Sequence, residues 1–380
     1  MGELFEIEGN RLALLVEGPE RLDALMALIA GARESLRLLY YIYAPDRVGS
    51  RVRDALIEAA QRGVAVSLVV DGFGSSASDA FFQPLAEAGA SICRFVPRWG
   101  RRYLLRNHQK MAIADGARAI IGGFNVADDY FAARPGHEWR DLGLAIEGPE
   151  VAPLSGYFDA LAEWARRPGA TMRSLRRGLD RWSEARGRTR WLLGGPARRL
   201  NPWVRAMKRD LGQCRRLDMI SAYFAPNPAM LRRIERICDR GGTARIVTAA
   251  KSDNGATVGA ARHCYARLLR HGVSIWEYQP AKLHTKLFVV DDAVHLGSAN
   301  FDMRSLYLNL EIMLRIKDKA FADHVRGYIE GELGYSREIT REAHARAGNW
   351  FARLRWALAY FMVAVLDYSV SRRLNFGIEG

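Results

Sequence analysis

The chain of 380 residues repeats itself, and this internal repeat restricts its fold more than any other feature. Its first half runs through an apolar strand, a helical pattern and a second apolar strand, at 36–46, 51–63 and 64–72. Its second half has the same order of patterns, at 217–227, 229–241 and 243–250. Strands that alternate with helices of about 10–15 residues indicate an α/β sheet covered by helices. We therefore expect two related α/β units in one chain.

Each half then reaches the same spaced motif, His-x-Lys-x4-Asp followed by Gly-(Gly/Ser)-x-Asn. The first copy contains His108, Lys110, Asp115 and Asn125. The second copy contains His284, Lys286, Asp291, Ser298 and Asn300. Residues two apart on a strand point to one face, so each His and Lys should lie together. The apolar stretches around each Asp predict hairpins that turn at 115–116 and 291–292 and return each Asn to its His-x-Lys pair.

These residue types suit the cleavage or transfer of a phosphodiester. A neutral imidazole can attack phosphorus to form a phosphohistidine, and a second imidazolium can protonate the leaving oxygen. The two lysines and two asparagines can donate hydrogen bonds to the non-bridging oxygens. This chemistry requires no metal and no cofactor, and the sequence shows no cluster of metal ligands. Two equivalent copies of the motif favour a catalytic role over two unrelated core histidines.

The positive charge is concentrated between the two halves. The chain has a net charge of +14. Residues 166–216 hold sixteen Arg or Lys and three acids, which is 16 − 3 = +13, together with Trp182, Trp191 and Trp203. This segment is compatible with a solvated basic linker, an interfacial patch for anionic lipid headgroups, or a nucleic-acid-binding stretch.

The cysteines, the N-terminus and the C-terminal segment predict where in the cell the protein is found. No Cys-x-x-Cys pair occurs among the four cysteines, which favours a reducing compartment. No signal peptide and no run of about 20 apolar residues is visible. Residues 341–380 are rich in aromatic and aliphatic side chains flanked by arginines. This composition predicts a helix in the membrane interface, with packing on the second domain or a partner as the alternative. We expect a peripheral protein of the cell membrane that reaches it from the cytoplasm.

The paired motifs resemble those of the phospholipase D superfamily, over about residues 9–334. Within it the chain is most similar to bacterial cardiolipin synthases, of the short type without N-terminal transmembrane helices. The similarity is carried by seven segments: 71–75, 138–151, 222–227, 250–253, 272–278, 282–286 and 297–312. The resemblance implies two pseudo-twofold-related α/β domains with one shared active site at their interface. It divides the chain into a first domain, a linker, a second domain and a membrane-interface segment, at 1–165, 166–216, 217–340 and 341–380.

The resemblance also implies roles for single residues. An acidic partner for each catalytic histidine is expected at Asp141 and Glu311, where it would fix the imidazole tautomer. Asp115 and Asp291 belong to the catalytic motif, although their turn positions suggest structural support. Two positions depart from the family: Gly123 replaces a frequent Ser, and Gln109 replaces a frequent Arg. We expect Gln109 to face away from the histidines and to matter little.

The leading functional hypothesis is phosphatidyl transfer from phosphatidylglycerol, with glycerol released and cardiolipin formed. The resemblance favours His108 as nucleophile and His284 as general acid. Partners are then phospholipid substrates and an anionic membrane surface, and one chain suffices for the site. Alternatives are hydrolysis of a phospholipid, a nuclease, and a degenerate scaffold. Nucleic acid is disfavoured because the small superfamily nucleases carry one motif per chain and dimerise. Phosphatidylethanolamine remains open as the donor, as do oligomeric state and membrane face. Tyr41, Tyr43, Tyr223 and Phe224 could line the pocket or pack in the core.

Overall fold

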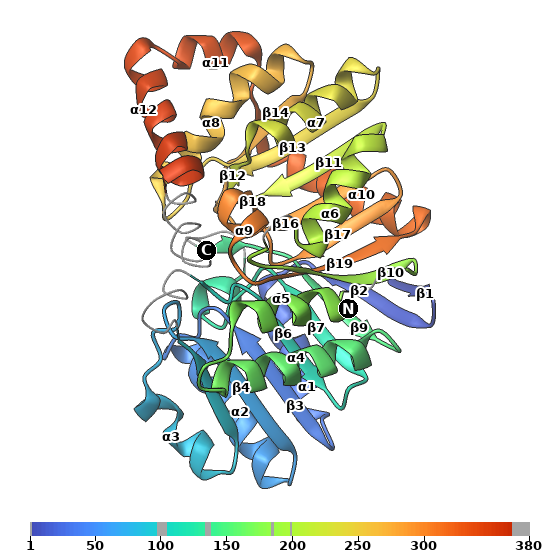
Figure 1. Cartoon of the computed structure of the whole chain (residues 1–380), viewed down its shortest axis with the longest axis vertical. Coiled ribbons are helices and arrows are strands. Elements are labelled where there is room, and N and C mark those ends of the chain that lie inside the picture. Colours follow the sequence, from blue (N-terminus) through green and yellow to red (C-terminus); the bar gives the residue numbers. More distant parts are fainter. Residues whose placement is uncertain (1, 97–104, 134–137, 184–185, 198–199, 367–380) are drawn as a thin grey trace.

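The computed structural model describes the chain except residues 1, 97–104, 134–137, 184–185, 198–199 and 367–380 (Figure 1). Two eight-stranded mixed sheets dominate it, one built from the first half of the chain and one from the second. The strand order is β1-β2-β9-β7-β6-β3-β4-β5 in the first sheet and β10-β19-β17-β16-β11-β13-β14-β20 in the second. The prediction of two repeated α/β domains is confirmed.

The first half of the chain contains these elements: β1 (Leu4–Ile7), β2 (Asn10–Leu15), α1 (Gly18–Ala30), β3 (Ser35–Tyr40), α2 (Arg47–Gln61), β4 (Ala65–Asp71), α3 (Asp79–Glu87), β5 (Ser91–Phe95), β6 (Met111–Ala114), β7 (Arg118–Gly122), β8 (Trp139–Arg140), β9 (Gly143–Glu147), α4 (Val151–Arg166) and α5 (Met172–Arg181). A 3-10 turn at Asp128–Tyr130 precedes β8.

The second half contains these elements: β10 (Thr189–Gly194), α6 (Pro202–Gln213), β11 (Arg216–Ser221), β12 (Phe224–Ala225), α7 (Pro228–Asp239), β13 (Thr243–Ala249), α8 (Gly255–Arg270), β14 (Ser274–Tyr278), β15 (Lys282–Leu283), β16 (Lys286–Val290), β17 (Ala293–Gly297), β18 (Phe301–Asp302), α9 (Met303–Tyr307), β19 (Glu311–Lys317), α10 (Lys319–Leu333), β20 (Ser336–Glu338), α11 (Arg341–Ala347) and α12 (Trp350–Tyr360). A short helical extension, Phe361–Leu366, continues α12.

Three large apolar cores hold these layers together. One lies in the first half under α1, α2 and α3, and one lies in the second half under α6, α7 and α8. The third is shared, because it includes Leu39 and Ile113 of the first sheet and Leu287 and Leu314 of the second. Burial of apolar surface contributes about 25 cal/mol per Å². The shared core therefore fixes the two sheets against each other at the level where the histidine motifs lie.

Residues 166–216, which we expected to form a linker, lie largely within the two domains. Strand β10 pairs with β19 in the second sheet, as β2 pairs with β9 in the first. The repeat therefore begins upstream of the segments that revealed it in the sequence. Trp191 and Trp203 are 1% and 0% exposed, and Trp182 packs against the shared core. These tryptophans support the fold and do not form an interfacial patch.

The C-terminal segment is helical as far as it is described. Helix α12 packs along α8, with Trp356 buried and the Tyr360 hydroxyl donating to the Pro226 carbonyl at 2.8 Å. None of the helices in the described ranges is both long and apolar enough to cross a membrane. The predicted membrane-interface segment at 341–380 extends beyond the described residues, which end at 366.

Candidate active site

Next to each motif histidine, a short stretch of backbone pairs with the other half of the chain. Strand β15, just before His284, pairs in parallel with β8 of the first half, and the His284 amide donates to the Arg140 carbonyl at 2.7 Å. Beside His108, Asn107 forms an isolated parallel β-bridge with Leu310 of the second half, and the His108 amide donates to the Leu310 carbonyl at 2.9 Å. Both histidines are therefore positioned by the backbone of the opposite half.

The acidic partner of each histidine also comes from the opposite half. Glu311, at the start of β19, lies 3.0 Å from His108 Nδ1 through both carboxylate oxygens. Asp141, directly after β8, lies 2.6 Å from His284 Nδ1. Because Nδ1 of each ring is engaged by a carboxylate, the other nitrogen, Nε2, is left for substrate. The two carboxylates were predicted from the sequence, but their exchange between the halves was not.

Burial controls the protonation of both imidazoles. It lowers the pKa of His284 to about 3; Lys286 adds to this effect and Asp141 opposes it. Burial also lowers the pKa of His108, where Glu311 opposes and Lys110 adds to the shift. Burial raises both carboxyl pKa values, but both still lie below their usual range, because the histidine partner, the motif lysine of the same pair and the hydrogen bonds together outweigh burial. The unliganded site thus favours neutral histidines beside ionised carboxylates.

The two motif lysines lie beneath the histidines and are almost fully buried. Each ammonium donates to the main-chain carbonyl of the histidine two residues before it. Burial lowers the pKa of Lys110 to about 7 and that of Lys286 to about 8. A lysine that loses its charge this easily is stabilised in its charged form by an anion. The pair therefore places positive charge behind the histidines, although neither lysine is among the residues that line the cavity between the halves.

A cavity of about 440 Å³ lies between the halves, and His108, His284, Asn125 and Asn300 all line it. Asn125 Oδ1 accepts from the Ile42 amide at 3.0 Å, which fixes the side chain. Its Nδ2 has no hydrogen-bond partner among the described residues. A buried donor without a partner is costly in an empty site. The hairpins therefore bring both asparagines to the histidines, as predicted, and Asn125 offers a donor to a ligand.

The two halves differ in how they hold their carboxylates. In the second half, Ser298 Oγ hydrogen bonds to Glu311 Oε2 and accepts from the Ile312 amide. In the first half the matching residue is Gly123, and a Cβ there would lie 2.3 Å from Asp141 Oδ1. The departure from Ser at Gly123 thus has a steric cause, because the shorter aspartate occupies the space of a side chain. The missing hydroxyl is replaced by the Leu142 amide, which donates to Asp141 Oδ1 at 2.8 Å.

Asp115 and Asp291 do not line the cavity. Both occupy hairpin turns with positive φ, 55° and 49°, and their carboxylates accept backbone amides from 33–35 and 215–216. The structure supports their predicted turn role and separates them from the other motif residues. Gln109 does not line the cavity, in agreement with its expected orientation, but it is fully buried, and its amide donates to the Tyr157 hydroxyl and to the Glu311 carbonyl.

Several lining residues were not singled out from the sequence. Tyr130 and Trp139 stack on each other and present their rings edge-on to His284, at 5.3 and 5.1 Å between centroids. Asp253 and Asp302 add carboxylates to the same cavity. Of the four aromatics that we considered, Tyr41 and Tyr223 line it, whereas Tyr43 and Phe224 are core residues. Only the position of Trp139, two residues before a candidate acid, offered a signal.

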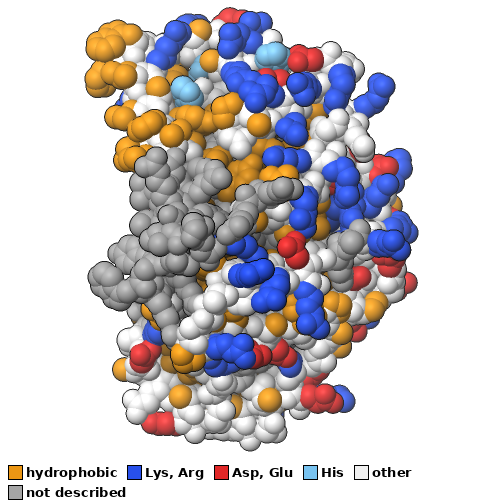
Figure 2. Space-filling view, viewed as in Figure 1, with side chains coloured by type: hydrophobic (Ala, Val, Ile, Leu, Met, Phe, Trp, Pro, Cys, Tyr) orange, Lys and Arg blue, Asp and Glu red, His pale blue; other side chains and the backbone are white. Residues whose placement is uncertain are grey.

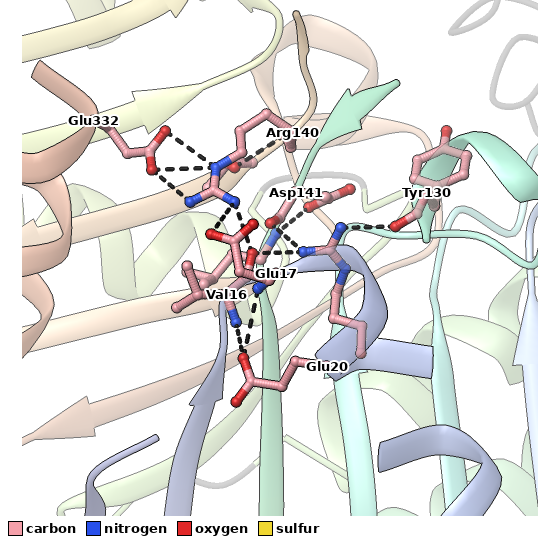
Figure 3. Close-up of polar contacts among 10 residues, drawn as sticks. Val16, Glu17, Glu20, Tyr130, Arg140, Asp141 and Glu332 are labelled. Atoms are coloured by element: carbon pink, nitrogen blue, oxygen red, sulfur yellow. Dashed lines mark hydrogen bonds and ion pairs between the residues drawn. The ribbon is translucent and has the colours of Figure 1, made fainter. Parts of the chain in front are cut away.

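Two arginines fix the segment that carries Asp141 (Figure 3). Buried Arg21 donates to the carbonyls of Asp141 and Tyr130, both at 2.7 Å. Arg140 pairs with Glu332 of the second half at 2.6 Å and with Glu17 at 3.2 Å. Both arginines also donate to the Val16 carbonyl. The acid beside His284 is therefore held by charges that tie α1, β8 and α10 together.

The described residues contain no group of three or more His, Cys, Asp or Glu placed to hold a metal ion. The site offers two imidazoles whose Nδ1 atoms face carboxylates, the Asn125 amide as a donor on the same cavity, and two buried ammonium groups behind the histidines. Fold and site together define a two-domain phospholipase D-like protein with one composite active site.

Comparison with known proteins agrees with this assignment to the phospholipase D-like class. Residues 25–162 and 207–332 match the family described as "Cardiolipin synthase, PLD-like domain". The chain is 32% identical over 352 residues to cardiolipin synthase A of Pseudomonas entomophila, and 33% identical over 355 residues to that of Pseudomonas putida strain W619. Both alignments span 90% of this chain and 72% of the relative. The chain therefore belongs to the cardiolipin synthase family, and it is a phosphatidyltransferase-type enzyme of the phospholipase D superfamily.

Solved structures share the fold. Phosphatidylserine synthase of Haemophilus influenzae Rd KW20 superposes with a TM-score of 0.72 over 95% of both chains, at 14% sequence identity. Polyphosphate kinase of Porphyromonas gingivalis gives a TM-score of 0.58 over 88% of this chain and 49% of its own, at 16% identity. At these identities the likeness concerns the fold alone.

Proposed function

We propose that this enzyme transfers the phosphatidyl group of one phosphatidylglycerol to a hydroxyl of a second, releasing glycerol and forming cardiolipin. The observation that carries the proposal is the pair of histidines with Nδ1 bound to a carboxylate, His108 to Glu311 and His284 to Asp141, on one cavity. The similarity to cardiolipin synthases over 90% of the chain supports the lipid substrate.

The proposed reaction has two balanced steps. Nε2 of neutral His108 attacks phosphorus, the bond from phosphorus to the glycerol oxygen breaks, and protonated His284 gives its proton to that oxygen. The acceptor hydroxyl then gives its proton to neutral His284 and attacks phosphorus, and the bond from phosphorus to His108 breaks. Lys110, Lys286 and the Asn125 amide stabilise the oxyanion charge in both steps. The bound phosphodiester favours the imidazolium that the first step requires, since an anion raises the pKa of nearby bases.

Incubation of the purified full chain with phosphatidylglycerol in mixed micelles tests the proposal. We expect cardiolipin and free glycerol in equal amounts, and loss of both products in His108→Ala and in His284→Ala. Formation of phosphatidic acid alone would favour hydrolysis. Cleavage of DNA with no lipid product would favour the nuclease alternative. Adding phosphatidylethanolamine to the phosphatidylglycerol micelles resolves the open choice of donor, because phosphatidylglycerol remains as the acceptor and ethanolamine is released in place of glycerol if phosphatidylethanolamine is the donor.

We further propose that the chain binds membranes peripherally through the outer face of α12 and its extension. Apolar side chains that are 40–75% exposed recur at helical spacing on this face: Trp350, Phe351, Leu354, Leu358, Phe361, Met362, Val365 and Leu366. Figure 2 shows hydrophobic side chains gathered over α12. The opposite face is occupied by contacts with α8. A helix with one packed face and one exposed apolar face, near Arg353 and Arg355, suits the interface of an anionic bilayer.

Flotation with anionic vesicles tests this attachment. We expect the double variant Leu354→Glu/Leu358→Glu to lose most of its vesicle binding while its unfolding temperature changes little, since both side chains are exposed. Leu4→Glu, at a 42% exposed leucine of β1, is the matched control and should bind normally. Full binding by the double variant would contradict the role of α12.

A further inference from the structure

A second cavity lies beside the catalytic one, between the start of α8 and helix α12, and neither mechanism nor fold requires it. Its volume is about 810 Å³, within the range of about 300–1,000 Å³ typical of ligand sites. We call it the α8–α12 groove. The side chains and backbone that line it include Gly255, Ala256, Gly259, Trp356, Leu358 and Met362. Most of this lining is apolar.

The groove opens onto the exposed apolar face of α12. Leu358 and Met362 line the groove and are 58% and 47% exposed. They therefore belong both to the groove and to the face that we propose to contact the bilayer. An acyl chain that enters here from a membrane would exchange one apolar environment for another, so entry needs no exposure of the chain to water.

The groove also borders the catalytic cavity. Residues 250–252 line the groove, and the next residue, Asp253, lines the catalytic cavity. Ser252 Oγ and the Tyr223 hydroxyl both donate to Asp253 Oδ1, at 3.0 and 2.9 Å. This hydrogen-bonded rim is the boundary between the two cavities. A ligand whose apolar part lies in the groove needs to cross only this rim to place a polar group at the histidines.

The charged residues of the groove fit an anionic amphiphile. Lys251 and Arg355 are exposed and line it from opposite sides, one before α8 and one on α12. Arg262 lines it as well, but its guanidinium is paired with buried Glu277 at 2.8 Å. The two cations can bind the phosphate of a phospholipid while the apolar lining contacts its acyl chains. A soluble polyanion would bind the cations but would leave the apolar lining without a partner.

We propose that the α8–α12 groove seats the acyl chains of a phospholipid substrate while its headgroup crosses the Ser252–Asp253 rim into the catalytic cavity. The proposal rests on the proposed function, because it assigns a part of the same lipid substrate. It also gives a role to the contact of α12 with α8, because among the described residues of the first half no helix packs against α3 in the place that α12 takes against α8.

A groove-filling variant tests the proposal. Gly255 is exposed at the start of α8, and a Cβ there would meet no atom within 4 Å, so Gly255→Trp should fill the groove without straining the fold. We expect kcat/KM for long-chain phosphatidylglycerol to fall about tenfold or more, because remote binding energy contributes to the transition state. Turnover of dihexanoyl phosphatidylglycerol below its micellar concentration should change less than about twofold, since its short chains gain little from the groove.

Gly327→Trp is the matched control, because Gly327 is an exposed glycine in α10 with the same open surroundings and no place in the groove. It should leave both substrates unaffected. An equal loss on both chain lengths in Gly255→Trp, or no loss on either, would overturn the groove proposal. If the wild-type chain makes no cardiolipin, the proposed function falls instead.

A second measurement does not depend on turnover. Vesicles that contain phosphatidylglycerol with a diazirine in one acyl chain are irradiated with the wild-type chain, and the adducts are mapped by mass spectrometry. We expect adducts within 255–262 and 355–362, and fewer of them in Gly255→Trp. Adducts confined to other segments, or to the contact between two copies of the chain, would overturn the proposal.

Discussion

At the scale of single residues, the site combines buried histidines and lysines whose pKa values are lowered, so that they lose their protons easily. Burial lowers the pKa of Lys110 to about 7 and that of Lys286 to about 8, while it also lowers the pKa of both histidines. In the proposed mechanism the lysines act as ammonium groups, and the nucleophilic histidine acts as neutral imidazole. Phosphate binding therefore weakens as pH rises through the lysine values, and attack weakens as pH falls below the histidine values.

The lowered pKa values of the lysines and histidines predict the pH dependence of kcat/KM. We expect the alkaline limb to fall between pH 7 and 8, where the two lysines lose their protons in the free enzyme. The acid limb should lie below the ordinary histidine pKa of about 6.5. In Lys286→Arg, Lys110 is the remaining motif lysine that loses its proton in this range. We therefore expect a lower overall rate, with the alkaline limb still present near the pKa of Lys110, about 7. A wild-type rate constant that holds up to about pH 10, the ordinary lysine range, would contradict this assignment.

The roles of the two histidines are separable by trapping. With a phosphatidyl donor whose leaving group needs no proton, His284→Ala should still form a phosphatidyl-enzyme, with the adduct on His108. His108→Ala should form none, because its nucleophile is gone. Mass spectrometry of acid-quenched enzyme locates the adduct. An adduct on His284 in the His108→Ala chain would reverse the roles.

At the scale of elements, the most consequential contact is the short parallel pairing of β8 with β15. It joins the halves directly beside His284, and buried Arg140 of β8 reinforces it through Glu332 and Glu17. Removing one partner of a buried ion pair leaves the other charge without compensation. The interface thus depends on a charge network as well as on the shared apolar core.

We expect Arg140→Met to lower the free energy of unfolding by about 3–5 kcal/mol, as for other buried pairs that lose one partner. Chemical denaturation of the full chain measures the change. Arg205→Met is the control, because the ion pair of Arg205 with Asp180 is exposed on both sides and should contribute less than about 1 kcal/mol. Equal effects of the two substitutions would contradict a structural role for the Arg140 network.

The elements also show what the sequence could predict. The repeat, the two hairpins and the lysines and asparagines of the two motifs followed from local pattern and spacing, because strand and turn signals are local. Asp141 and Glu311 came from the family resemblance, whereas most of the other residues that line the cavity were not predicted. The exchange of Asp141 and Glu311 between the halves was not predicted either, since spacing along the chain says nothing about packing across a pseudo-twofold axis. The interval 166–216 was misjudged because exposed arginines hid the apolar faces of α5 and α6, which bury Leu175, Leu179 and Trp203.

At the scale of the whole molecule, the two halves of the chain build the candidate active site together. Each half supplies a histidine, a lysine and an asparagine, but the carboxylate and the backbone carbonyl that orient its histidine belong to the other half. Neither half therefore contains a complete acid or base. The shared core between the sheets places all of these groups within a single chain, so the site requires no second copy.

A mixing experiment follows from this arrangement. Full-length His108→Ala and His284→Ala chains, each inactive, should remain inactive when mixed or coexpressed, because each chain closes its own defective site. If two chains instead exchanged their halves, a fraction of sites would combine the intact His108 half of one with the intact His284 half of the other, and cardiolipin formation would return. Wild-type enzyme mixed with excess double variant His108→Ala/His284→Ala is the control. It should keep its full activity per wild-type chain if the site is intramolecular, whereas exchange of halves would dilute that activity in proportion to the excess.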